Sequence, residues 1–169
     1  MKNRPARSLA LIGLLAAFAL VTFVIESQIP SPFALPGVKL GLANIFTLVA
    51  LPLLGRKEAA AVLTVRILLG SLFTGTTITL LYSLAGGVLC YVVMALVYQP
   101  LGERLTWVTS VLGALAHNLG QMATAMMVLG KNVLYYAPVL VLSGILTGLF
   151  TGLAAGFALK ALKALKKDR

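Results

Sequence analysis

Residues 8–25 read SLALIGLLAAFALVTFVI, an apolar run without a charged side chain, and Glu26 follows it directly. A helix needs about 20 predominantly apolar residues, at 1.5 Å of rise each, to cross the hydrocarbon core of a bilayer. Basic residues precede the run and Ala-Phe-Ala stands at 17–19, which together imitate a secretory signal peptide. The run is long for such a peptide and further apolar segments follow it, so we interpret it as an uncleaved first membrane helix.

The rest of the chain repeats this pattern and predicts an all-α integral membrane protein with six transmembrane helices. Of its 169 residues, 60% are hydrophobic and 11% are charged, whereas about 25% are charged in soluble domains. Three prolines and a glycine predict a non-helical connection after the first helix. We expect a single membrane domain over 1–169, with a basic cytoplasmic tail over 160–169. The expected helices cover residues 8–28, 40–54, 58–73, 77–99, 105–129 and 133–160.

The charge of the chain is strongly basic, with a formal net charge of +10. Nucleic-acid binding is not indicated, because the basic residues form no patch interleaved with aromatic residues. They gather at helix ends, and one side of the expected bundle receives eleven of the fourteen Lys and Arg. The positive-inside rule then places both termini in the cytoplasm. We expect the bacterial cytoplasmic (inner) membrane as the location and the lipid bilayer as the surroundings.

Seven polar residues lie in or beside the apolar segments, where polar side chains are costly and usually functional. At 1.5 Å per residue, all of them fall between the midplane and the outer surface of the membrane. We therefore expect a ligand-binding site that opens away from the cytoplasm and takes an anionic small molecule. The seven candidates are Glu26, Lys39, Asn44, Arg66, His117, Asn118 and Gln121.

Two interpretations of Arg66 stay open at this stage. A guanidinium near the midplane requires an anion, and Glu26 is the only acid expected on its side of the membrane, so a structural ion pair is one possibility. The other is that Arg66 and Lys39 bind a phosphate or carboxylate, helped by backbone N–H groups where the second helix begins. The amides Asn44, Asn118 and Gln121 would then orient the ligand, or alternatively tie helices together.

Several kinds of chemistry find no support in the sequence. One His and one Cys, on different helices, do not make a metal constellation, so no metal site is predicted and His117 is taken as a hydrogen-bond donor. No serine, histidine and acid grouping is readable, and the chain has no phosphate-binding loop for ATP. We expect no cofactor, no ATP site and no catalytic residue.

A ridge of small residues marks the last expected helix. Glycines at every fourth position let another helix approach closely, which is the main packing device where lipid is the solvent. The ridge fits packing inside the bundle, or docking of a partner membrane protein. Its members are Gly144, Gly148, Gly152 and Gly156.

Several short motifs resemble a bacterial membrane family. They are IES at 25–27, PGVKLGLAN at 36–44, RILLG at 66–70, YSLAGG at 82–87, HNLGQ at 117–121 and PVL at 138–140. Together they resemble the heptaprenyl diphosphate synthase component I family, also called the Gx transporter family. The resemblance covers about residues 8–160.

That family resembles the substrate-binding S components of energy-coupling factor (ECF) transporters. The resemblance implies a six-helix bundle with an outward ligand site, docked on a transmembrane coupling subunit that two ATPases drive. In S components, small residues on the first helix contact the coupling subunit. The positions that match here are Ala6, Ala10, Gly13 and Ala17.

The family name implies an alternative, a non-catalytic membrane subunit of polyprenyl diphosphate or quinone synthesis. Catalysis is not expected, because prenyl synthases bind magnesium through aspartate-rich clusters and the only Asp here is Asp168. Family members also resemble proteins encoded beside flavin-linked electron-transfer components, which implies a scaffold role as a third class. The implied ligands are prenyl- or quinone-related molecules, or a flavin.

Overall fold

The computed structural model describes residues 4–29, 39–74 and 77–167, and this part of the chain is helical and contains no strand. Six α-helices and two short 3₁₀ helices follow one another. They are α1 (Arg4–Gln28), α2 (Asn44–Leu54), α3 (Arg56–Thr74), α4 (Thr77–Leu101), η1 (Gly102–Leu105), α5 (Thr106–Leu129), η2 (Lys131–Tyr136) and α6 (Ala137–Lys167).

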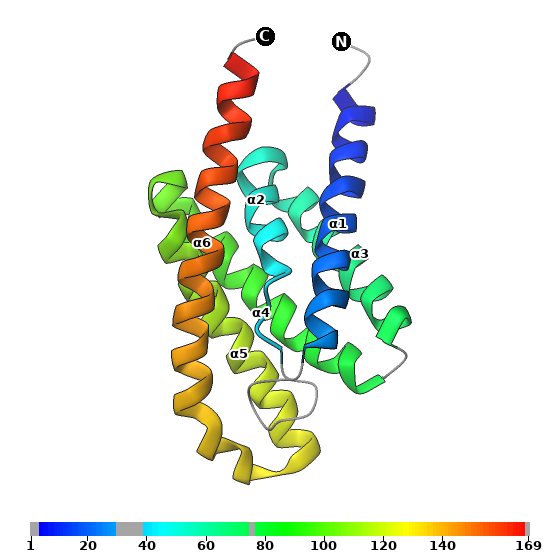
Figure 1. The fold of residues 1–169 in the computed structure, drawn as a ribbon, viewed down its shortest axis with the longest axis vertical. Coiled ribbons are helices and arrows are strands. Elements are labelled where there is room, and N and C mark those ends of the chain that lie inside the picture. Colours follow the sequence, from blue (N-terminus) through cyan, green and yellow to red (C-terminus); the bar gives the residue numbers. More distant parts are fainter. Residues whose placement is uncertain (1–3, 30–38, 75–76, 168–169) are drawn as a thin grey trace.

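The helices run alternately up and down, so that α1 begins and α6 ends at the same end of the bundle (Figure 1). The junction between α2 and α3 lies at this end too, and η2 lies at the other. The largest contacts join α4 to α5 and α5 to α6, whereas α1 contacts mainly α3 and α2. The first helix therefore lies on the outside of the bundle, while α5 lies between α4 and α6.

Three helical segments are long and apolar enough to cross a membrane, namely Ala6–Gln28, Thr77–Leu129 and Lys131–Ala164. The second of them contains both α4 and α5. Large apolar side chains are exposed along these segments, including Leu9, Met127 and Phe157 at 70% or more. Such a surface is typical of a protein whose solvent is lipid, and the chain is a helical membrane-type protein.

Four predicted helix boundaries differ from the structure by four residues or more, and one of them is the start of α1 at Arg4 rather than at residue 8. Helix α2 begins at Asn44 rather than at residue 40, because Gly41 adopts φ +81° and makes a turn that interrupts the helix. Residues 133–136 belong to the 3₁₀ helix η2, so α6 begins at Ala137. Helix α6 ends at Lys167 rather than at residue 160, so the basic residues of the predicted tail are helical and continue α6.

The glycine ridge packs α6 against α5. A Cβ added to Gly148 would lie 2.6 Å from Val111 Cα, and one added to Gly152 would lie 2.6 Å from Trp107 Cα, so neither position has room for a side chain. Beside them, the Ser110 and Thr151 hydroxyls form a 2.9 Å hydrogen bond between the two helices. The ridge thus serves packing inside the bundle at these positions, as one of the two interpretations predicts.

Candidate functional site: a buried polar cluster

The Glu26 carboxylate holds the turn that precedes α2. Its Oε1 accepts a hydrogen bond from the Gly41 N–H at 2.7 Å, and its Oε2 accepts one from the Leu42 N–H at 3.1 Å. Glu26 is 6% exposed, so these are charge-assisted bonds shielded from solvent. The end of α1 is thereby tied to the start of α2, which explains why the turn is stable although no side chain of α2 caps that helix.

Arg66 lies almost fully buried on α3 and points toward α2. Its Nη2 donates a 2.9 Å hydrogen bond to the Asn44 Oδ1, whereas its buried Nε has no hydrogen-bond partner. The ion pair with Glu26 that the sequence left open is not formed, and among the described residues the ion pair present joins Lys163 to Glu103. Arg66 is therefore a buried cation without a bound carboxylate.

The buried Phe23 ring on α1 lies beside both cations of the cluster. The Lys39 Nζ lies 3.6 Å from the centroid of the Phe23 ring, and the Arg66 guanidinium carbon lies 5.3 Å from it. Cations placed over a ring face are attracted by its quadrupole. The Lys39 Nζ is buried and has no hydrogen-bond partner, so the ring is its main contact.

His117 and Gln121 form the wall of the cluster on α5. The Gln121 Oε1 accepts a 3.1 Å hydrogen bond from the Lys39 backbone N–H, and its Nε2 lies 2.9 Å from the His117 Nε2. A backbone N–H can only donate, so the amide orientation is fixed and its NH₂ donates to the His117 Nε2. The proton of a neutral imidazole then resides on Nδ1, which is buried without a partner.

Glycines on two elements leave the space that the His117 ring occupies. A Cβ on Gly41 would lie 2.8 Å from the His117 Cδ2, and one on Gly86 would lie 2.8 Å from its Cε1 and Nδ1. A third glycine, Gly120, approaches the α4 backbone so closely that its Cβ would lie 2.5 Å from the Ala85 carbonyl oxygen. The ring is therefore held between the turn before α2 and the middle of α4.

These residues surround a small cavity with about 10 Å³ of free volume, roughly the space of one water molecule. Three buried donors around it lack a partner: the Lys39 Nζ, the Arg66 Nε and the His117 Nδ1. Buried polar groups without a partner are rare in proteins, and all three here would be satisfied by an acceptor. The cavity is lined by Phe23, Glu26, Lys39, Gly41, Ala43, Arg66, Ser83, His117 and Gln121.

The structure brings together six of the seven predicted residues and separates the seventh. Asn118 faces α6, where its Nδ2 donates to the Leu140 carbonyl at 2.7 Å and lies 3.4 Å from the Ser143 hydroxyl. His117 and Asn118 are consecutive in the sequence and thus differ by about 100° around α5. Asn118 ties helices together, whereas Asn44 reaches the cavity through its bond to Arg66.

Sequence reasoning missed the apolar and small members of the site. Phe23 is one of many apolar residues in the first apolar run, and Ser83 is one of many hydroxyl residues. Gly41 and Gly86 have no side chain that could indicate a function. The motifs at 36–44 and 82–87 do contain both glycines. These two glycines contribute room for the His117 ring rather than a reactive group.

The fold and the cluster define the class: a helical membrane-type protein with a buried, cation-rich polar cluster among its helices. A comparison with known families matches residues 15–158 to heptaprenyl diphosphate synthase component I. The match covers most of the chain, and the protein belongs to this family. No curated protein and no solved structure matches it.

Proposed function

We propose that this chain is a membrane binding protein that takes a small anionic or amphipathic ligand from the outer side, in the manner of an ECF-type S component. The observation that carries the proposal is the set of three unpartnered donors around one cavity, contributed by Lys39, Arg66 and His117. Two of the three donors belong to the cationic side chains of Lys39 and Arg66. Their natural occupant is a phosphate, diphosphate or carboxylate group, with Arg66 supplying directional hydrogen bonds.

The proposal includes a six-helix membrane domain with both termini in the cytoplasm. Helix α2 has 11 residues, about 16 Å of rise, so it crosses the membrane only together with the turn before it. Basic residues lie where α1 begins, where α2 meets α3 and where α6 ends, and these points share one end of the bundle (Figure 1). The positive-inside rule favours the cytoplasm for that end and the outer side for the polar cluster.

The cavity is too small for such a ligand in this structure, since it holds about one water molecule. Entry of a ligand therefore requires the elements around it to separate. The exposed outer position of α1 suits this, because α1 contributes Phe23 and Glu26 and is the helix with the smallest buried share among the candidate spans. A ligand that replaces the bonds from Glu26 to Gly41 and Leu42 would free α1 from α2.

The partner in this proposal is a transmembrane coupling subunit with two ATPases. It is supported by the exposure of Ala6, Ala10, Gly13 and Ala17 on α1, where a Cβ added to Gly13 would meet no atom within 4 Å. The chain itself lacks an ATP-binding loop, so ATP hydrolysis would belong to the partner.

An alternative follows from the family name, which describes one component of a heptaprenyl diphosphate synthase. In that role the chain would be a non-catalytic membrane subunit, and the same cationic cavity would hold the diphosphate of a prenyl chain. The single Asp in the sequence, Asp168, supports a non-catalytic role, because prenyl-transfer chemistry needs several carboxylates to hold magnesium.

The deciding experiment is native mass spectrometry of the gently purified protein, followed by identification of the molecules that denaturation releases. We expect one anionic or amphipathic molecule per chain in the wild type, and its loss in Lys39→Gln. The matched control is Lys131→Gln, which removes a lysine charge at an exposed position on η2. A neutral ligand, or one retained equally by both variants, would refute an anion site at the cluster.

The identity of the released molecule separates the two candidate functions. A flavin or another soluble nutrient would support transport, whereas a prenyl diphosphate would support the synthase component. Co-purification of ATPase subunits with the wild type, and their loss in Gly13→Leu, would support the transporter partner.

A further inference from the structure

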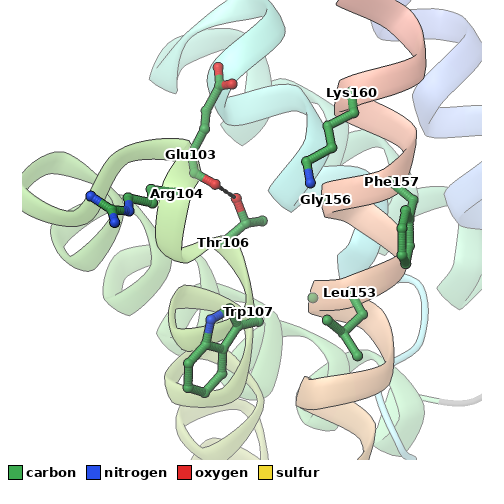
Figure 2. A pocket seen from close by; sticks show the side chains of 9 residues that line it. Glu103, Arg104, Thr106, Trp107, Leu153, Gly156, Phe157 and Lys160 are labelled. Carbon is green, nitrogen blue, oxygen red and sulfur yellow. Dashed lines mark hydrogen bonds between the residues drawn. The ribbon is translucent and has the colours of Figure 1, made fainter.

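A second pocket lies between η1, the start of α5 and the second half of α6, far from the polar cluster. Its free volume is about 130 Å³, enough for several water molecules. Trp107 is ten residues before His117 on α5, so about 15 Å of helix separates this pocket from the cluster. Figure 2 shows its walls, which include Thr106, Trp107, Leu153, Gly156 and Lys160.

The pocket lies where α5 begins: Trp107 in the first turn of α5 packs against Gly152, and the next turn of α6 faces η1. A Cβ at Gly152 would lie 2.6 Å from the Trp107 Cα, but a Cβ at Gly156 would meet no atom within 4 Å. The predicted ridge of four glycines therefore has two functions. Gly148 and Gly152 let the helices touch, whereas Gly156 leaves open space where they no longer do. Helix packing therefore does not explain why residue 156 is a glycine.

The walls of the pocket change from apolar to cationic along α6. Leu153 and Phe157 are 54% and 70% exposed, and Trp107 opposite them is 44% exposed, so this part is apolar and open to the surroundings. One turn further along α6, Lys160 extends its amine into the space between α6 and η1 (Figure 2). The Glu103 carboxylate is occupied by Lys163, so it does not neutralise Lys160.

We propose that this pocket binds an anionic phospholipid of the adjacent leaflet. Its headgroup phosphate contacts Lys160, and an acyl chain lies along Leu153 and Phe157. The order of the walls matches the order of a lipid in the membrane, because the apolar part lies toward the middle of α6 and the cation toward its end. Gly156 supplies the space where the headgroup joins its chains. This site is independent of the ligand proposed for the polar cluster.

The chain offers a direct probe, because Trp107 is its single tryptophan and lines the pocket. The purified protein is reconstituted in bilayers that contain brominated phosphatidylglycerol or, separately, brominated phosphatidylcholine, both at low mole fraction. Bromine quenches tryptophan fluorescence on contact. We expect the anionic lipid to quench Trp107 with about fivefold higher apparent affinity, the effect of one lysine near a membrane surface.

Two pairs of variants locate the effect. Lys160→Gln should abolish the preference for phosphatidylglycerol, while Arg104→Gln should retain it within about twofold, because the Arg104 guanidinium points away from the pocket (Figure 2). Gly156→Leu should reduce quenching by both lipids by filling the pocket. Ala161→Leu is its control, since that exposed position on the same helix does not line the pocket.

Three results would overturn the proposal. Equal quenching of the wild type by the two lipids would mean general contact with the bilayer. Equal losses in Lys160→Gln and Arg104→Gln would mean surface charge without a site. Relief of quenching by millimolar inorganic phosphate would assign the pocket to a free phosphate instead of a lipid. Circular dichroism measures whether each variant is folded. If Gly156→Leu is unfolded, Lys160→Gln still tests the proposal.

Discussion

His117 and Asn118 are neighbours on α5, yet they belong to two regions of the molecule that treat polar groups differently. Toward α6, the Asn118 amide is bonded to the Leu140 carbonyl and the Ser143 hydroxyl, and Ser110 is bonded to Thr151. Toward α1 and α4, the cluster around His117 contains three buried donors without a partner. The first region is complete without a ligand, and the second is not.

On this difference we base the proposal that the cluster, and not the α5–α6 contact, is the binding site. Side-chain hydrogen bonds between membrane helices contribute about 0.6–2 kcal/mol each, so a satisfied pair needs no other explanation. An unsatisfied buried donor costs about 1–3 kcal/mol, and more if it is charged. The cluster contains such unsatisfied donors, whereas the polar groups at the α5–α6 contact are hydrogen-bonded. This is why we propose that the ligand binds at the cluster. Four predictions test the contrast, from the largest effect to the smallest.

Replacing Arg66 by Met should produce the largest effect and should move binding and stability in opposite directions. We expect a loss of ligand affinity of about 100-fold, because a buried charged hydrogen-bond partner of the ligand disappears. The thermal midpoint in detergent should stay equal or rise, since an unpaired buried charge is exchanged for an apolar side chain of similar length. Ligand binding by mass spectrometry and melting by circular dichroism measure the two quantities. A strongly destabilised variant would show that Arg66 serves the fold.

Replacing Glu26 by Gln should mainly destabilise the connection between α1 and α2. The carboxylate accepts two N–H groups, whereas an amide presents one oxygen and one NH₂ to the same two donors. We expect a loss of about 2 kcal/mol in unfolding free energy. Glu103→Gln is the control, because it breaks an exposed ion pair worth about 0–1 kcal/mol. Comparable losses in denaturant titrations of both variants would contradict the assigned role of Glu26.

Replacing Asn118 by Leu should lower stability by about 1 kcal/mol and leave ligand affinity unchanged, because its bonds go to α6. Its neighbour provides the comparison: His117→Leu should weaken binding, since a donor at the cavity is lost. Equilibrium unfolding and ligand titration of the two variants make the measurement. An affinity loss in Asn118→Leu equal to that in His117→Leu would place Asn118 in the site after all.

The sequence predicted most of the helices and most of the cluster for physical reasons that can be stated. Apolar runs of membrane length define α1, α4, α5 and α6 without ambiguity, and charged residues inside such runs are costly enough to stand out. The start of α2 was missed because it depends on a bond from Glu26, 15 residues earlier in the chain, to the Gly41 turn. A contact between residues so far apart in the sequence cannot be predicted from a local sequence pattern.

The assignment of individual polar residues was harder to predict than their importance. Asn118 shares an apolar helix with His117, and only the positions of α4 and α6 decide which of the two faces the cavity. The glycines were equally ambiguous, because a regular spacing of four predicts one function for all of them. Only the position of α5 in the structure shows that the two differ: Gly152 contacts α5 and Gly156 does not.

The smallest expected effect is that of Lys39→Arg, which tests whether the charge of Lys39 is what the ligand needs. The Lys39 Nζ is buried over the Phe23 ring and has no hydrogen-bond partner, so an anion in the cavity would be attracted to its charge. Lys39→Arg keeps a positive charge and should retain most of the ligand affinity, whereas Lys39→Gln removes the charge and should bind weakly. Ligand titrations of the wild type and the two variants make the comparison, and an affinity of Lys39→Gln equal to that of the wild type would remove Lys39 from the binding of the anion.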